Sequence, residues 1–82
     1  MMHPGVFLKG EINHHKLSIS YVANYLGYSR SQLHRVLRGE CAISRRMAIA
    51  LEGKYGGDRD WWLGQQKKYD EFVFASKVKE LK

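Results

Sequence analysis

Residues 18–39 have the sequence SISYVANYLGYSRSQLHRVLRG, which predicts two short helices joined by a tight turn. Ser18 and Ser29 each stand where a helix can begin, because a serine hydroxyl accepts the free backbone N–H groups of a first turn. Gly27 follows the first helix, at a position where glycine adopts a left-handed backbone at little cost. This arrangement is typical of the helix-turn-helix, whose second helix enters the major groove of DNA. We therefore expect a helix-turn-helix at about residues 18–38.

The second of these helices, expected from Arg30 to Arg38 with Gly39 ending it, has two different sides. At about 100° per residue, its apolar residues share one side and suit a core. These residues are Leu33, Val36 and Leu37. The opposite side carries Ser31, His34, Arg35 and Arg38, and Arg30 completes the outward face. Such a face suits a groove lined with hydrogen-bond acceptors.

Positive charge is concentrated around the same helix. The chain has a net charge of +6, and residues 29–46 contribute +4 of it, with five arginines against Glu40. Guanidinium groups match phosphates and guanine edges with two hydrogen bonds, whereas the ammonium of lysine is a point charge. A solvated basic surface is the alternative interpretation of this cluster. Its composition of arginine alone favours contact with a polyanion.

The position of each polar side chain predicts its role on DNA. The first turn of a recognition helix points at base edges, so we expect Arg30, Ser31 and Arg35 to read bases. We group Gln32 with them, although from its flank it suits an adenine and a phosphate equally. The remaining polar residues are expected to contact the DNA backbone. They are Ser20, Ser29, His34, Arg38, Arg45 and Arg46.

Helical spacing also accounts for the rest of the chain. Pro4 suits the first turn of a helix that ends near residues 13–15, and Ser44 and Asp58 can cap two further helices. Apolar residues recur at helical spacing within these three segments. They are Val6, Phe7, Leu8 and Ile12, then Met47, Ala48, Leu51 and Tyr55, then Trp62, Tyr69 and Val73. We expect an all-α fold of about five helices.

Four glycines and residues 71–75 bear on where these helices begin and end. Gly56 and Gly57 are expected to separate the last two helices, whereas Gly10 and Gly53 are expected inside helices. A glycine in a helix interior costs about 1 kcal/mol relative to alanine. Strand-like alternation is limited to residues 71–75, which leaves a short strand there as an alternative.

Aromatic side chains gather in the last expected helix, at about residues 58–75. A Trp and Tyr stripe at helical spacing can stack on bases, but it more often forms a core or a dimer interface. The chain has the length of one domain, and a domain this small buries a modest share of its surface. We expect a single domain, residues 1–82, that forms a homodimer through this helix. The expected interface residues are Trp61, Trp62, Tyr69, Phe72 and Val73.

Other classes of protein fit the sequence poorly. The four histidines lack a zinc-ligand spacing, so we expect neither a metal nor another cofactor. The acids are scattered rather than grouped, which argues against a nuclease or another enzyme. Cys41 suits a small loop residue better than a redox sensor, and a single cysteine suits a reducing cytoplasm. Neither a signal peptide nor a membrane segment is recognisable, so we expect a bacterial cytoplasmic protein.

Three blocks of the sequence resemble, in this order, the HigA-type branch of the Xre/lambda-repressor-like family. They are HPGVFLKGE at residues 3–11, LSISYVANYLGYSRSQLHRVLRGECAISRRMAIALE at 17–52, and WWLGQQKKYD at 61–70. The resemblance implies a dimeric antitoxin that neutralises a RelE/HigB-like mRNA-cleaving toxin and represses their shared operon at a palindromic DNA operator. A stand-alone phage or plasmid repressor of the same family remains the alternative.

Overall fold

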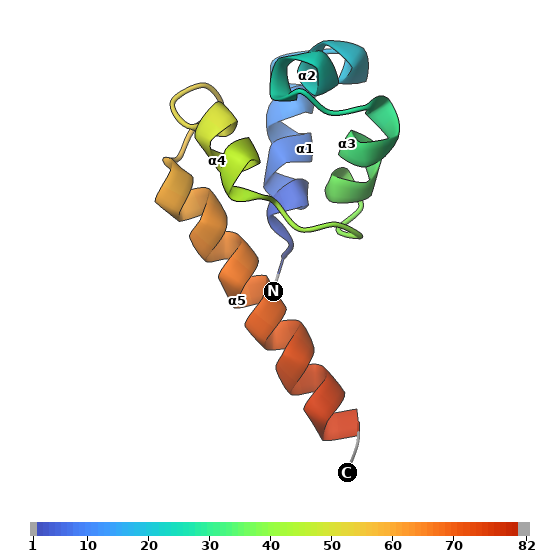
Figure 1. Ribbon diagram of the computed structural model, residues 1–82, viewed down its shortest axis with the longest axis vertical. Helices are drawn as coiled ribbons and strands as arrows, with labels where there is room; N and C mark the ends of the chain where they lie inside the picture. Colours follow the sequence, from blue (N-terminus) through green and yellow to red (C-terminus); the bar gives the residue numbers. More distant parts are fainter. Residues whose placement is uncertain (1, 81–82) are drawn as a thin grey trace.

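The computed structural model describes residues 2–80, which form five α-helices and contain no β-strand. The helices are α1 (Pro4–His14), α2 (Ile19–Leu26), α3 (Arg30–Leu37), α4 (Arg45–Leu51) and α5 (Arg59–Glu80). The four shorter helices pack into one group, and α5 runs beside it and projects well past its end (Figure 1). The expected all-α fold is confirmed. A strand at residues 71–75 is wrong, because α5 continues through this segment.

Side chains cap the helices where the sequence predicts them. The hydroxyl oxygens of Ser18, Ser29 and Ser44 accept the backbone N–H three residues ahead at 3.0–3.1 Å. The carboxylate of Asp58 accepts the N–H of Trp61 at 2.8 Å and so caps α5. Each N–H would otherwise lack a partner, and such a cap contributes about 1 kcal/mol. The boundaries of α2 and α3 are therefore set largely by nearby residues.

Glycines end the helices at several points. Gly27 follows α2 with φ +73°, and Gly39 comes shortly after α3 with φ +78°. The expected position of Gly53 inside a helix is wrong, because α4 ends at Leu51 and Gly53 has φ +76°. Its flexibility serves the turn between α4 and α5 rather than weakening a helix.

The core lies between the four short helices and the first half of α5. It contains the predicted apolar faces of α2, α3 and α4, together with residues of α1 and α5. The fully buried side chains include Leu8, Val22, Leu33, Val36, Met47, Leu51 and Trp62. Trp62 is only 1% exposed, so its assignment to a dimer interface is wrong. Its indole fills the core of its own chain instead.

Gly5 allows α1 to approach α3 closely. A Cβ atom on Gly5 would lie 2.0 Å from the carbonyl oxygen of Val36, which is far inside any permitted contact. Only glycine fits between these two helices. This contact fixes α3 against α1 and thereby sets the orientation of the polar face of α3.

Candidate nucleic-acid interface

The two sides of α3 are separated by burial as the sequence predicts. Leu33, Val36 and Leu37 are buried against the core. All the predicted DNA-contacting residues of α3 are exposed: Arg30, Ser31, Gln32, His34 and Arg35, followed by Arg38 directly after the helix. The helix therefore presents a continuous polar surface whose cations are arginines.

The start of α4 lies against the helix-turn-helix turn. The hydroxyls of Tyr28 in the turn and Ser44 at the start of α4 lie 2.8 Å apart. A Cβ on Gly27 would lie 2.5 Å from Nη2 of Arg46, so the guanidinium of Arg46 rests on the turn. Arg45 and Arg46 are both exposed, and Arg46 lies against the turn that leads into α3. We call Arg30, Ser31, Arg35, Arg45 and Arg46 the arginine face.

Three of the predicted contact residues, Ser29, Gln32 and Arg38, already form hydrogen bonds within the chain. The side-chain oxygen of Gln32 accepts the N–H of Ser29 at 2.8 Å, which completes a reciprocal cap with the Ser29 hydroxyl. A two-point contact of Gln32 with adenine would need that oxygen, whereas its free NH2 can donate to a phosphate without breaking the cap. Arg38 forms an exposed ion pair with Glu40, which leaves other guanidinium N–H groups available. Ser20 is exposed in the first turn of α2.

His3 is an important buried polar residue whose role the sequence argument missed. It is 5% exposed, and its Nδ1 accepts the N–H of Gly5 at 2.9 Å, so it caps α1. Its ring meets that of Tyr69 on α5 edge to face, with centroids 4.9 Å apart. The sequence did contain a signal for this role, because His3 directly precedes Pro4 and Pro4 suits the first turn of a helix. His3 thus ties α1 to α5.

Burial lowers the pKa of His3 below its ordinary value of 6.5, against smaller raising effects of the Asp70 charge and of a backbone hydrogen bond with Cys41. The cap has the same consequence, because a protonated Nδ1 cannot accept the Gly5 N–H. Neutral His3 is therefore the form that fits the fold.

A second concave site lies away from the arginine face, between α1 and the start of α5. The cavity measures about 300 Å³ and is lined by Phe7, Glu11, Tyr55, Gly56, Gly57, Trp61 and Trp62. The rings of Phe7 and Trp61 meet edge to face, with centroids 5.3 Å apart. We call this site the Trp61 pocket. It brings together residues that are far apart in the sequence.

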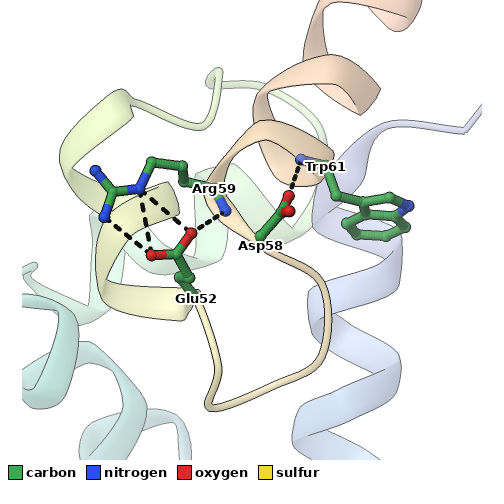
Figure 2. A network of polar contacts seen from close by, with 4 residues as sticks. All are labelled: Glu52, Asp58, Arg59 and Trp61. Carbon is green, nitrogen blue, oxygen red and sulfur yellow. Dashed lines mark hydrogen bonds and ion pairs between the residues drawn. The ribbon is translucent and has the colours of Figure 1, made fainter.

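An ion pair secures the start of α5 beside this pocket (Figure 2). The carboxylate of Glu52 accepts hydrogen bonds from the backbone N of Arg59 at 2.8 Å and from its Nη2 at 2.9 Å. These hydrogen bonds from Arg59 lower the pKa of Glu52 and raise the pKa of Arg59. Figure 2 shows the Arg59 guanidinium and the Trp61 indole pointing to opposite sides of the helix.

Two solved structures with a similar fold are described as antidote proteins. No family model matches the chain. A protein described as an antidote of a plasmid maintenance system, from Nostoc punctiforme, superposes with a TM-score of 0.88 and 26% identity, over 96% of this chain and 87% of that one. An addiction module antidote protein of a HigA family, from Coxiella burnetii, superposes with a TM-score of 0.85, the same identity and the same coverage.

Two curated relatives come from Dichelobacter nodosus. Virulence-associated protein A' is 32% identical over 69 residues, which are 83% of this chain. Virulence-associated protein I is 33% identical over 70 residues, which are 84% of this chain. The chain spans 60% and 65% of the length of these relatives. Its likeness to the antidote structures therefore covers more of the protein compared than its likeness to the curated relatives does.

The second half of α5, residues 71–80, extends beyond the core, and we call it the α5 extension (Figure 1). Phe72 and Phe74 are 50% and 69% exposed, and Val78 is also exposed. At about 100° per residue, Phe74 and Val78 share one side of the helix, and Phe72 lies on the opposite side. Tyr69 and Val73, predicted in a dimer interface, are half-buried. The extension is thus apolar on two sides without a covering element among residues 2–80.

Two further properties concern the described residues as a whole. Within residues 2–80, no group of three or more His, Cys, Asp or Glu side chains is arranged to hold a metal ion. None of the helices there is long and apolar enough to cross a membrane. Cys41 is half-buried and packs against the core.

Proposed function

We propose that this chain is an antitoxin that binds its own operator, represses a toxin–antitoxin operon and neutralises a RelE/HigB-like mRNA-cleaving toxin. The observation that carries the proposal is the superposition of 96% of the chain on two antidote proteins. The arginine face supports the DNA-binding part independently, because α3 exposes its arginines and Arg46 at the start of α4 rests on the turn that leads into α3. The protein acts by binding rather than by catalysis.

The arginine face suggests how DNA is bound. With α3 in the major groove, the forks of Arg30 and Arg35 can pair with guanine O6 and N7, each worth about 1–3 kcal/mol of discrimination. Ser31 lies between them and adds a hydroxyl. Arg45 and Arg46 then meet phosphates beside the groove. The other backbone contacts come from Ser20, Ser29, His34 and Arg38, joined by the free amide of Gln32.

A second copy of the chain is the proposed cover of the α5 extension. A helix that is apolar on more than one side is normally enclosed by other chain segments. Tyr69, Val73 and Phe74 also line a groove of about 440 Å³ beside the loop after α3, with room for side chains of another copy. A twofold dimer would place two α3 helices on half-sites about one turn of DNA apart. We therefore propose a palindromic operator and an interface of Tyr69, Phe72, Val73 and Phe74.

Trp61 is removed from the proposed dimer interface. It lies eleven residues before Phe72, which is about 16 Å along a helix. Its indole packs on Phe7 in the Trp61 pocket rather than continuing the surface of the extension. The two aromatic surfaces of α5 are therefore assigned to different partners.

Co-expression with the adjacent reading frame tests the antitoxin function. The product of that frame alone is expected to arrest growth, and this chain is expected to relieve the arrest and to shift DNA from upstream of the operon in a gel. Arrest that this chain fails to relieve, together with an intact gel shift, would favour a stand-alone repressor. Loss of the gel shift would contradict the DNA-binding function itself.

A further inference from the structure

The Trp61 pocket combines an aromatic wall with a carboxylate. Trp61 and Phe7 form the wall, and Glu11 lines the cavity from α1, one helical turn beyond Phe7. The side chain of Glu11 is 38% exposed, and one of its oxygens lies 3.3 Å from Nε2 of His15. Within residues 2–80, the other oxygen of Glu11 accepts no hydrogen bond and forms no ion pair. An aromatic face next to a carboxylate is the environment that favours a cationic side chain.

The aromatic wall is held in place before any partner binds. The backbone N–H of Trp61 donates to the carboxylate of Asp58, and the indole ring meets the ring of Trp62 edge to face, with centroids 5.0 Å apart. A Cβ on Gly57 would lie 2.8 Å from Cε3 of Trp61, so the ring lies directly on the glycine backbone. Trp61 nevertheless remains 39% exposed. A rigid and exposed tryptophan of this kind is typical of an interface hot spot.

Among the described residues that line the pocket, the charged side chain is the carboxylate of Glu11, although the chain as a whole is cationic. Asp58 and Asp60 lie close to Trp61 in the sequence, before and within the first turn of α5. Arg59 lies between these two acids in sequence, but its guanidinium points away from Trp61 to pair with Glu52 (Figure 2). A chain with a net charge of +6 therefore presents an acidic aromatic pocket here. Such a pocket disfavours DNA and favours a cation.

We propose that the Trp61 pocket receives a lysine or arginine side chain of the toxin. The proposal rests on the antitoxin function and names the surface and the chemistry of that contact. The cation stacks on the Trp61 ring and pairs with the free oxygen of Glu11. Since no residue of the arginine face lines the pocket, toxin and operator can occupy the protein together.

Charge variants of Glu11 test the pocket directly. The probe is the purified product of the adjacent reading frame, titrated calorimetrically into wild type, Glu11→Gln and Glu11→Lys. We expect Glu11→Gln to weaken binding about tenfold and Glu11→Lys to weaken it further, because a like charge repels the incoming cation. Operator binding by both variants should match wild type, which shows that they are folded.

Glu71→Gln is the matched control, because Glu71 is an exposed glutamate that belongs neither to the Trp61 pocket nor to the four residues of the proposed dimer interface. It is expected to bind the same probe as tightly as wild type. Glu11→Lys binding like wild type would overturn the proposal, as would a loss with Glu71→Gln that Glu11→Gln does not show. In those cases the antitoxin function stands and only its contact surface changes. A wild-type chain that binds its operator but not the probe would overturn the antitoxin function and the pocket together.

Discussion

The arginine face and the α5 extension are both exposed, yet they differ in how favourably water solvates their side chains. The side chains of the arginine face are polar and are well solvated without a partner. The extension exposes Phe72, Phe74 and Val78 on a helix that leaves the core. Exposed phenylalanines on two sides of one helix are unusual for a surface that stays free. This difference supports the proposals that the arginine face binds DNA reversibly and that a second copy of the chain covers the extension.

The two regions also differ in how the sequence encodes them. The arginine face depends on local signals, since Ser29 and Gly39 set the limits of α3 and Arg46 follows the cap at Ser44. The extension is marked in the sequence by apolar and aromatic residues, including Phe72 and Val73, but these residues do not specify what covers them. The role of the extension depends on the partner that covers it, and helical spacing within one chain does not identify that partner.

The largest effect should come from removing the aromatic side chains of the extension. Phe72→Ala combined with Phe74→Ala is expected to give monomers in light scattering, because the two substitutions remove most of the apolar surface that the proposed dimer would bury. Operator affinity should fall by about 10²–10⁴-fold, because the two half-sites are then bound independently. Trp61→Ala serves as the control and should remain a dimer. A wild-type protein that is monomeric both at micromolar concentration and on DNA would contradict the proposal that a second copy covers the extension.

A smaller effect should separate base reading from phosphate contact within the arginine face. Arg35→Ala and Arg30→Ala are expected to relax sequence preference and to weaken binding to the preferred operator by about 1–3 kcal/mol. Arg46→Ala should weaken binding to all duplexes alike and reduce the salt slope by about 0.9 for each phosphate that is no longer neutralised. Anisotropy titrations on operator and scrambled duplexes distinguish the two. The proposed placement of α3 in the major groove is wrong if Arg46→Ala changes the preferred bases and Arg35→Ala does not.

The smallest effect concerns His3, which ties α5 to the helices that carry the arginine face. Its pKa is lowered in the folded state, so the unfolded chain binds more protons below pH 6.5. His3 should therefore stabilise the fold fully above pH 6.5, and this contribution should be lost as the pH falls from 6.5 through the folded-state pKa. Chemical denaturation of wild type and His3→Asn between pH 5 and 7.5 measures the difference, and the variant keeps a capping side chain.

The two variants of His3 should differ in how much folding stability they lose. His3→Ala should lower the free energy of unfolding by about 0.5–2 kcal/mol at neutral pH, because the substitution removes the cap of α1. His3→Asn should lose less, and its stability should vary less with pH between 5 and 7.5 than that of wild type. Equal pH dependence in wild type and His3→Asn would show that His3 protonation does not couple α5 to the rest of the fold.

Much of the fold could be predicted because its signals are local. Caps at Ser18, Ser29, Ser44 and Asp58 act within three residues, and the positive φ at Gly27 is a property of the turn itself. The outward polar side of α3 followed from helical periodicity alone. These are short-range effects that a sequence displays directly.

The features that were missed depend on contacts between distant residues. Trp62 is equally apolar in a core and at an interface, and only the packing of α5 on the other helices buries it. Gly5 has a role only because Val36 lies opposite it. The Trp61 pocket joins α1 to the start of α5, which no periodicity within one helix can reveal. Tertiary packing, rather than local propensity, determines these positions.

The central claim is that the arginine face binds duplex DNA, and a salt titration of the wild-type chain tests it most directly. Fluorescence anisotropy on a labelled duplex from upstream of its own gene should show tight binding at 50 mM salt and weaker binding to a scrambled duplex. A dimer that neutralises about 6–10 phosphates should lose about 10³–10⁵ in affinity between 50 and 200 mM salt. Absence of binding at 50 mM salt, or an affinity that salt leaves unchanged, would contradict the account.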